Sequence, residues 1–479
     1  MPVIPPEHRF RTLVLCFDGT GDQFDADNSN IVELFSMLPK ADRTRQMVYY
    51  QAGIGTWSNP QVATPLWSKV NKMLDEAIAC HLDTHVMGGY EFLMQNYTAG
   101  DRICLFGFSR GAYVARSLAG MLHKVGLLPA CNHQQIPFAY KMYTTTDETG
   151  WKQSNAFKKA FSIDVDIEFI GVWDTVNSVG LIPKRLPFTT SNTIVRTFRH
   201  AISLDERRAK FKPNLWNRPN DKEQMLSVTD KQVHAHKHHD HEHAHAAKKP
   251  SQRAMERQYS RDITQPTDVE EVWFAGCHCD VGGGSVENNT ASTLARIPLR
   301  WMVRECFKTN SGIMFHADGL RGIGLDPESL YPVVKPRPPA LPVGDARIRV
   351  RDVPPSSERS DPAHAGDELA ASPTLFVHKT EEELDRADAL APLYDQLRLR
   401  WFWWLLELIP LRHRYQRGDN AWMSYVAWNM GRGRFIPKQQ EKGVRVHRSV
   451  KTRLEAQTES GRAYKPKAAF DLARTIWVD

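Results

Sequence analysis

Residues 102–122 read RICLFGFSRGAYVARSLAGML. The first seven, Arg102–Phe108, form an apolar run that predicts a buried strand, and a helical pattern follows the next turn to about Leu122. Between them, residues 107–111 spell G-x-S-x-G. A serine at a strand-to-helix turn is typical of a nucleophile elbow, because flanking glycines prevent clashes and the helix N-terminus stabilises developing negative charge. We therefore predict that Ser109 is a nucleophile; a Gly/Ser-rich turn without chemistry is the alternative.

Strand-like runs on both sides of this stretch alternate with helix-like segments, such as the helical spacing of Leu66–Asn96. The other runs that predict buried strands are Thr12–Phe17, Met47–Gln51, Val165–Trp173 and Val269–Ala275. Strands separated by helices imply a largely parallel sheet. The predicted fold class is α/β, with an α/β-hydrolase-like, mostly parallel sheet covered by helices on both faces.

Composition shifts divide the chain into three parts. We predict a catalytic domain at 8–310 with a polar, His-rich insertion at 205–265, because that stretch is charged and lacks apolar periodicity. An extended or partly disordered Pro-rich and charged segment is expected at 311–375. A helical, Trp-rich region at 376–479 is expected to pack on the catalytic domain or to cap it.

The serine needs a base and an orienting carboxylate. In this fold class these follow the serine in the order acid, histidine, each just after the carboxyl end of a strand. Asp174 follows the run IEFIGVW, and His278 follows VEEVWFAG. We predict that Asp174 and His278 complete a triad with Ser109. The alternatives are an Asx-turn or helix cap at Asp174 and a hydrogen-bonded turn histidine at His278.

An oxyanion hole needs two backbone N–H groups near the nucleophile. Arg110 directly follows the serine and supplies the first. The loop after the first strand supplies the best second candidates, Gly19 and Thr20, because glycine lets the backbone approach a ligand closely. Asp18 is a competing acid or an orienter of this loop, and a plain turn is the alternative.

Residues 277–280 read CHCD, which suggests a metal site. Neighbouring residues on an extended chain point to opposite faces, so we predict no metal there and no cofactor. The following Val281–Gly284 is expected to be a flexible turn that lets His278 reach Ser109, with Asp280 hydrogen-bonded inside it. We favour a solvated insertion for the histidine run at 234–245, with adventitious metal binding as the alternative.

Trp401–Leu411 reads WFWWLLELIPL and is too short to span a bilayer. Arginines flank it on both sides, a profile typical of membrane surfaces, at Arg398, Arg400, Arg412 and Arg414. We favour a core helix that packs on the hydrolase domain, and keep peripheral membrane contact as the alternative.

The net charge of +7 over 479 residues is mild and spread along the chain, which argues against a nucleic-acid partner. The seven cysteines are scattered and odd in number, as in a reducing compartment. Met1–Arg11 has no apolar stretch typical of a secretory signal. We therefore expect a cytoplasmic protein.

Five runs resemble one family in their order and letters: LCFDGTGDQ, HVMGGYEFL with NYTAGDRICLFGFSRGAYVAR, FIGVWDTV, HAISLDERR and WFAGCHCDVGGG. They resemble the type VI secretion phospholipase-effector catalytic-domain family, a former domain of unknown function common in bacteria and fungi, over roughly residues 11–310. The resemblance implies an α/β-hydrolase fold and the triad Ser109, Asp174 and His278. Its bacterial effectors are phospholipases. The chain departs at Cys279 and Ser285, where the family has a small or polar residue and often an aromatic one, and no secretion adaptor is evident.

These observations predict a serine hydrolase that cleaves carboxylic esters, with lipid or phospholipid esters as the leading substrates. An acyl thioesterase or deacylase acting on a small soluble substrate uses the same triad and is the first alternative. A hydrolase-fold binding protein without turnover is the second. Labelling with a fluorophosphonate probe separates the enzymes from the binding protein.

Overall fold

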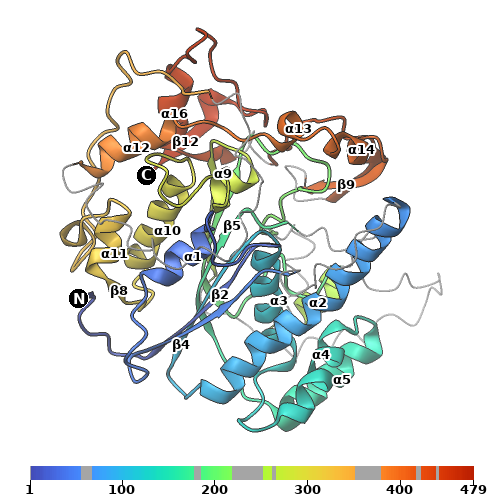
Figure 1. Ribbon diagram of the computed structural model, residues 1–479. Coiled ribbons are helices and arrows are strands. Elements are labelled where there is room, and N and C mark those ends of the chain that lie inside the picture. Colours follow the sequence, from blue (N-terminus) through green and yellow to red (C-terminus); the bar gives the residue numbers. More distant parts are fainter. Residues whose placement is uncertain are drawn as a thin grey trace, which may run out of the picture.

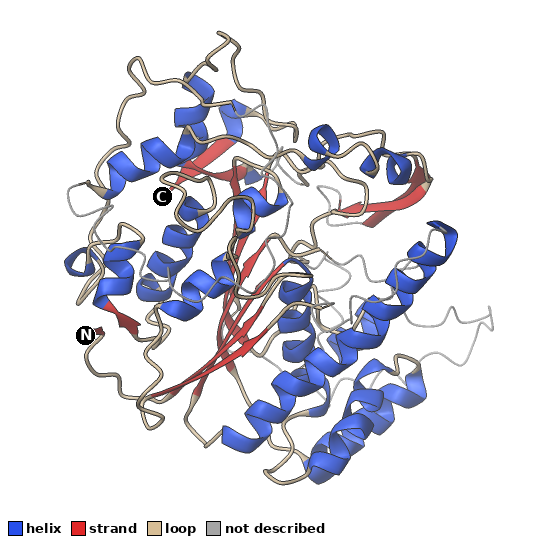
Figure 2. Ribbon diagram, in the orientation of Figure 1, coloured by secondary structure: helices blue, strands red, loops and turns tan. Residues whose placement is uncertain are grey.

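Eight strands form the central sheet of the computed structural model, and every neighbouring pair runs parallel (Figure 2). Their order is β12-β11-β7-β6-β5-β4-β2-β3. The strands are β2 (Thr12–Phe17), β3 (Gln46–Gln51), β4 (Arg102–Phe108), β5 (Ile167–Trp173), β6 (Val195–Ser203), β7 (Asp268–Phe274), β11 (Val444–His447) and β12 (Thr475–Val478). The predicted parallel α/β fold is confirmed.

The structure describes most of the chain, in eight segments: 2–54, 67–176, 185–217, 252–260, 266–350, 379–416, 422–437 and 442–479. The histidine run at 234–245, most of the predicted insertion around it and the stretch 351–378 lie outside these residues. The predicted domain boundaries remain predictions.

Alternating side chains of the strands bury against helices on both faces, which produces two apolar layers. Leu13 and Leu15 of β2 pack in one layer, and Val14 and Cys16 pack in the other. The first layer is closed by α2 (Trp67–Asn96), α3 (Ser109–Val125), α4 (Ile136–Thr144) and α5 (Glu148–Phe161), which lie together in Figure 1. The second is closed by α1 (Asn30–Ser36), α9 (His278–Gly282), α10 (Arg296–Lys308) and α11 (Ala317–Gly322).

The sheet order reverses between β2 and β4. From β2 the chain crosses by α1 to the edge strand β3, then returns by α2 to β4 on the other side of β2. The carboxyl ends of β2 and β4 therefore lie beside each other at the point where the connections change face. Ligand sites of open parallel sheets lie at such a point.

The region 376–479, predicted to be helical, also contains four strands, and this part of the prediction was wrong. β11 and β12 extend the central sheet, and β9 (Leu411–Gln416) pairs antiparallel with β10 (Trp422–Ala427). Two of these strands, β11 and β12, escaped detection because they have only four residues each. The helices of this region are α12 (Glu381–Ala389), α13 (Gln396–Leu399), α14 (Trp403–Glu407) and α16 (Arg448–Glu455).

The prediction of a core helix at Trp401–Leu411 was also wrong. Only the five residues of α14 are α-helical in this stretch. Most of its large apolar side chains are exposed, whereas its single acid, Glu407, is buried. The remaining elements are small: β1 (Val3–Ile4) pairs with β8 (Phe315–His316), and α8 (Gln252–Gln258) packs near α5.

Candidate active site

Ser109 stands at the junction of β4 and α3, as predicted for an elbow. Its φ of 57° lies in the left-handed region, which few non-glycine residues adopt. A Cβ on Gly107 would lie 2.5 Å from the Ala112 backbone, and one on Gly111 would lie 2.3 Å from carbonyl oxygens of Phe17 and Asp18. The two glycines are therefore required by close packing of the strand, the turn and the loop after β2.

Three predicted side chains meet above the carboxyl edge of the sheet. His278 Nε2 lies 2.8 Å from Ser109 Oγ, and His278 Nδ1 lies 2.6 Å from Asp174 Oδ2. All three side chains are buried. With an ionised Asp174, Nδ1 carries the imidazole proton and Nε2 accepts from the serine hydroxyl. This arrangement allows the imidazole to remove the serine proton.

The charges around the triad set its protonation. Burial alone raises the pKa of Asp174, but the Arg434 guanidinium and the hydrogen bond with His278 outweigh it and hold that pKa far below its ordinary value. Burial lowers the pKa of the His278 imidazole, and its contacts with Asp174 offset only part of the shift. At neutral pH the carboxyl is therefore ionised and the imidazole is neutral, as a general base requires.

Arg434 is a partner of Asp174 that the sequence did not reveal. Its Nη1 lies 2.5 Å from Asp174 Oδ1 and its Nη2 lies 2.9 Å from Oδ2, which makes a two-point ion pair. The Ser203 backbone N–H also donates to Asp174 Oδ1, at 2.9 Å. Both oxygens are thus fixed while one faces His278. No local pattern marks Arg434, because it lies 260 positions from Asp174.

The turn that holds His278 is packed and short, so the prediction of a flexible glycine turn was wrong. His278 begins the helix α9 after β7. A Cβ on Gly282 would lie 1.9 Å from the Phe108 ring, which shows that this glycine permits close packing. Asp280 accepts from the backbone N–H of Cys277 at 2.9 Å and of Tyr394 at 3.0 Å, and burial raises its pKa to about 6. Asp280 thus braces the histidine turn.

The run HAISLDERR at 200–208 supports the site residue by residue. His200 Nε2 accepts from the Thr175 N–H at 3.1 Å, just after Asp174. Asp205 accepts from the Gly276 N–H at 2.8 Å, and Glu206 accepts from the His278 N–H at 3.3 Å. The resemblance had marked this run, but the sequence alone gave its members no role.

The predicted oxyanion loop lies against the elbow. Asp18 accepts from Ser29 Oγ at 2.6 Å, Tyr50 Oη at 2.8 Å and the Gly19 N–H at 2.8 Å. Burial raises the pKa of Asp18, and these hydrogen bonds oppose the shift. Asp18 is therefore an orienter of the loop in this structure. The Gly19 N–H donates to Asp18, and the Thr20 hydroxyl is buried without a partner among the described residues.

Aromatic rings cover the imidazole on two sides. Phe108 and Phe211 each lie 4.8 Å from the His278 ring, between centroids. Phe211 in turn contacts Trp403 at 5.6 Å. The rings keep water from the imidazole and link the site to α14. The sequence gave no sign of this link.

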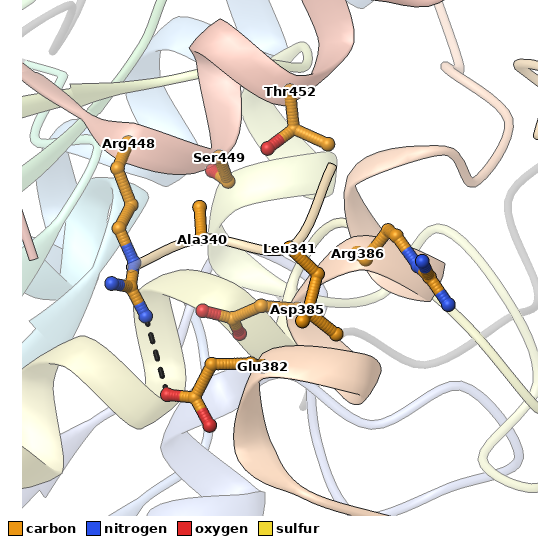
Figure 3. A pocket seen from close by; sticks show the side chains of 8 residues that line it. All are labelled: Ala340, Leu341, Glu382, Asp385, Arg386, Arg448, Ser449 and Thr452. Carbon is orange, nitrogen blue, oxygen red and sulfur yellow. Dashed lines mark hydrogen bonds and ion pairs between the residues drawn. The ribbon is translucent and has the colours of Figure 1, made fainter. Parts of the chain in front are cut away.

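Two hollows lie elsewhere. A broad groove runs along the amino ends of β4 to β7, past Arg102, Ile167 and Asp268. This groove lies at the edge of the sheet opposite to Ser109. Active sites of open parallel sheets lie at the carboxyl edge, so we assign the candidate site to the carboxyl edge and not to the groove. A small pocket of about 10 Å³ lies between α12 and α16, where Arg448 pairs with Glu382 at 3.3 Å (Figure 3). It has room for about one water and contains no predicted site residue.

Among the described residues no group of three or more His, Cys, Asp or Glu side chains is arranged to hold a metal ion. In the same residues no helix combines the length and apolarity needed to cross a membrane.

The parallel sheet, the strained serine and the adjoining imidazole and carboxylate define the α/β-hydrolase class. The chain belongs to the family described as T6SS, phospholipase effector Tle1-like, catalytic domain, which it matches over residues 11–305. The predicted family is thereby confirmed. Membership indicates a lipase or phospholipase activity for this domain.

The chain is similar to the uncharacterized protein YEL023C of Saccharomyces cerevisiae, with 28% identity, covering 98% of this chain and 82% of that protein. An uncharacterized Pseudomonas aeruginosa protein of known crystal structure is 16% identical, covering 63% of this chain and 46% of its own, with a TM-score of 0.32. The structure of a Tle1 effector bound to the VgrG spike of the type 6 secretion system is 16% identical. The alignment covers 58% of this chain and 52% of that chain, with a TM-score of 0.26. The chain thus spans about half of each solved structure.

Proposed function

We propose that the chain is a serine hydrolase that cleaves phospholipid or related lipid esters through Ser109, His278 and Asp174. The observation that carries this proposal is the contact of His278 Nε2 with Ser109 Oγ at 2.8 Å, on an imidazole whose other nitrogen contacts Asp174. The family match supports the lipid substrate class.

In the acylation step Ser109 Oγ attacks the ester carbonyl carbon while His278 Nε2 takes the hydroxyl proton. The resulting oxyanion is received by backbone N–H groups of Arg110 and Thr20; Gly19 joins them if its N–H leaves Asp18. His278 then gives its proton to the leaving alcohol. In the second half His278 takes a proton from water, the hydroxide attacks the acyl-serine, and Ser109 regains its proton as the fatty acid leaves.

Replacement of the nucleophile tests the proposal. Ser109→Ala is expected to lower kcat for phospholipid hydrolysis by about 10⁴-fold or more, because no other group in the site provides the acyl acceptor. Ser117→Ala is the matched control, since Ser117 is a buried serine of the same helix that donates to the Tyr113 carbonyl. Fatty-acid release from purified folded variants is the measurement. Retained turnover in Ser109→Ala would refute the proposal.

The substrate class is tested separately. A series of esters and thioesters of increasing chain length, measured below and above their aggregation point, separates a lipase from a soluble-substrate thioesterase. The lipase proposal predicts a rise in rate at aggregation. The cytoplasmic location stays a prediction of the sequence.

A further inference from the structure

The segment 395–435, which we name the arm, concentrates the exposed apolar surface of the molecule. Its described residues, 395–416 and 422–435, comprise α13, α14, β9, β10 and the short stretches beside them. More than half of the large apolar side chains exposed among the described residues belong to it: Trp401, Phe402, Trp404, Leu405, Leu408, Ile409, Met423, Tyr425, Val426, Trp428, Met430 and Phe435. Large apolar side chains that are exposed together in one segment are typical of docking sites.

In the arm an acidic side chain is buried and leucines are exposed, which is the reverse of the usual distribution. Glu407 is buried and accepts from the Ala209 N–H, Asn429 Nδ2 at 2.6 Å and the Gly431 N–H at 2.8 Å. Leu405 of the same short helix and Leu408, which directly follows it, are exposed. A helix that faces water exposes its acid and buries its leucines. The exposed side chains of the arm are therefore suited to contact an apolar neighbour.

The arm is fixed next to the triad. Its Trp403 contacts Phe211, which contacts His278. The Arg207 Nε–Asp395 Oδ2 pair, at 2.7 Å, ties the start of the arm to the loop after β6. Figure 1 shows α13, α14 and β9 projecting at the edge of the molecule beyond α9. A surface bound by the arm would thus lie close to Ser109.

The charge of the arm points to one kind of neighbour. Arg398, Arg412 and Arg432 are exposed around the apolar side chains. The acids among the described residues of the arm are Asp395, which pairs with Arg207, and Glu407, and both are buried. Aromatic and aliphatic side chains edged by arginines match the headgroup and acyl boundary of an anionic bilayer.

We propose that the arm docks on an anionic phospholipid surface and holds the Ser109 site against it. The docking stands on the arm alone; the delivery of substrate to Ser109 rests on the proposed function. A second copy of the chain is the competing occupant, and the test distinguishes it.

The experiment measures sedimentation of the full chain with vesicles, using the Ser109→Ala background so that the lipid stays intact. Vesicles of phosphatidylcholine alone are compared with vesicles that also contain phosphatidylserine. The parent is expected to bind the anionic vesicles more tightly, and less so at raised salt. The triple variant Trp401→Ser, Leu405→Ser and Leu408→Ser is expected to lose at least about tenfold in partitioning.

The matched control replaces three side chains of equal exposure outside the arm. Val333, Ile163 and Leu472 are 74%, 47% and 57% exposed, against 74%, 46% and 57% for Trp401, Leu405 and Leu408. Their triple serine variant is expected to bind vesicles as the parent does. Thermal unfolding checks that both variants are folded. A third variant, Arg398→Gln with Arg412→Gln and Arg432→Gln, is expected to lose the preference for phosphatidylserine.

Two results overturn the docking proposal: equal binding by the parent and the arm variant, or no binding of anionic vesicles by the parent. A parent dimer that the arm variant converts to monomer, without vesicle binding, assigns the surface to a second copy. Vesicle binding without ester hydrolysis by the wild-type chain contradicts the proposed function and leaves the docking intact. Ester hydrolysis by the wild-type chain without arm-dependent vesicle binding contradicts the docking proposal and leaves the proposed function intact.

Discussion

The strand β2 and the helix α14 distribute similar side chains in opposite ways. In β2, Leu13 and Leu15 are fully buried, and the polar Asp18 that follows is held by hydrogen bonds at the carboxyl edge. In α14 and the residue after it, Leu405 and Leu408 are exposed while Glu407 is buried. The first arrangement stabilises a fold in water and positions chemistry at the edge of the sheet. The second gives up apolar burial in water, which indicates a surface shaped by another neighbour.

The largest expected effect lies on the sheet side of this comparison. Asp174→Asn is expected to lower kcat by about 10⁴-fold, because an amide favours the wrong imidazole tautomer and cannot stabilise the imidazolium. The change also leaves Arg434 without its ionic partner, so we expect a lower Tm as well. Rates and Tm are measured together on the purified variant. A loss of less than about tenfold would remove Asp174 from the mechanism.

The sequence predicted several strands of the central sheet well, because the apolar runs that mark them are local patterns. Apolar runs ended at Phe17, Phe108 and Trp173 in the structure as they did in the sequence. The strand β6 was missed because it reads VRTFRHAIS, and its charges are neutralised only in three dimensions, for example by Arg199 Nε and Glu305 Oε2 at 2.7 Å. A buried strand with such pairs has no apolar run to detect.

The structure of the arm was predicted poorly, because the contacts that determine it join distant positions. A stretch of Trp, Leu and Ile normally lies in a core, so the core-helix interpretation followed the general rule. Glu407 is satisfied by groups at Ala209, Asn429 and Gly431, which no local pattern brings together. The role of Arg434 was equally invisible, because ion pairs between distant positions leave no mark on a single sequence.

Arg434 joins the two regions, and its replacement gives the second largest effect. Arg434→Met is expected to lower kcat/KM by about 10- to 100-fold and to reduce stability by about 3–5 kcal/mol, because the buried Asp174 carboxylate loses its partner. Arg434→Lys keeps the charge but loses the two-point geometry, so we expect an intermediate result. Activity and denaturant unfolding of both variants provide the measurement.

The pH profile shows whether Arg434 acts on the imidazole. The neutral form of His278 is the base, and its pKa lies below the ordinary value, so kcat/KM of the wild type falls only as the pH drops below about 6.5. Removing the nearby positive charge favours the imidazolium and moves this acid limb to higher pH. Lower activity with an unmoved limb would limit Arg434 to a structural role.

The smallest expected effect concerns the anchor of the arm. Glu407→Gln replaces one accepting oxygen by an NH₂ group that faces N–H donors, which costs about 1–3 kcal/mol locally. Hydrogen exchange of the backbone amides in the described residues of the arm should become faster, while those of β4 and β5 stay protected. Equal acceleration in the central strands would show that the arm and the sheet unfold as one unit.

Labelling with a fluorophosphonate probe, followed by peptide mapping, tests the central claim most directly. The account predicts a single adduct on Ser109 in the folded protein, and its loss in His278→Ala, because the hydroxyl reacts only when the imidazole takes its proton. An unlabelled Ser109 in the folded wild-type chain, or an adduct that forms equally well without His278, would contradict the account.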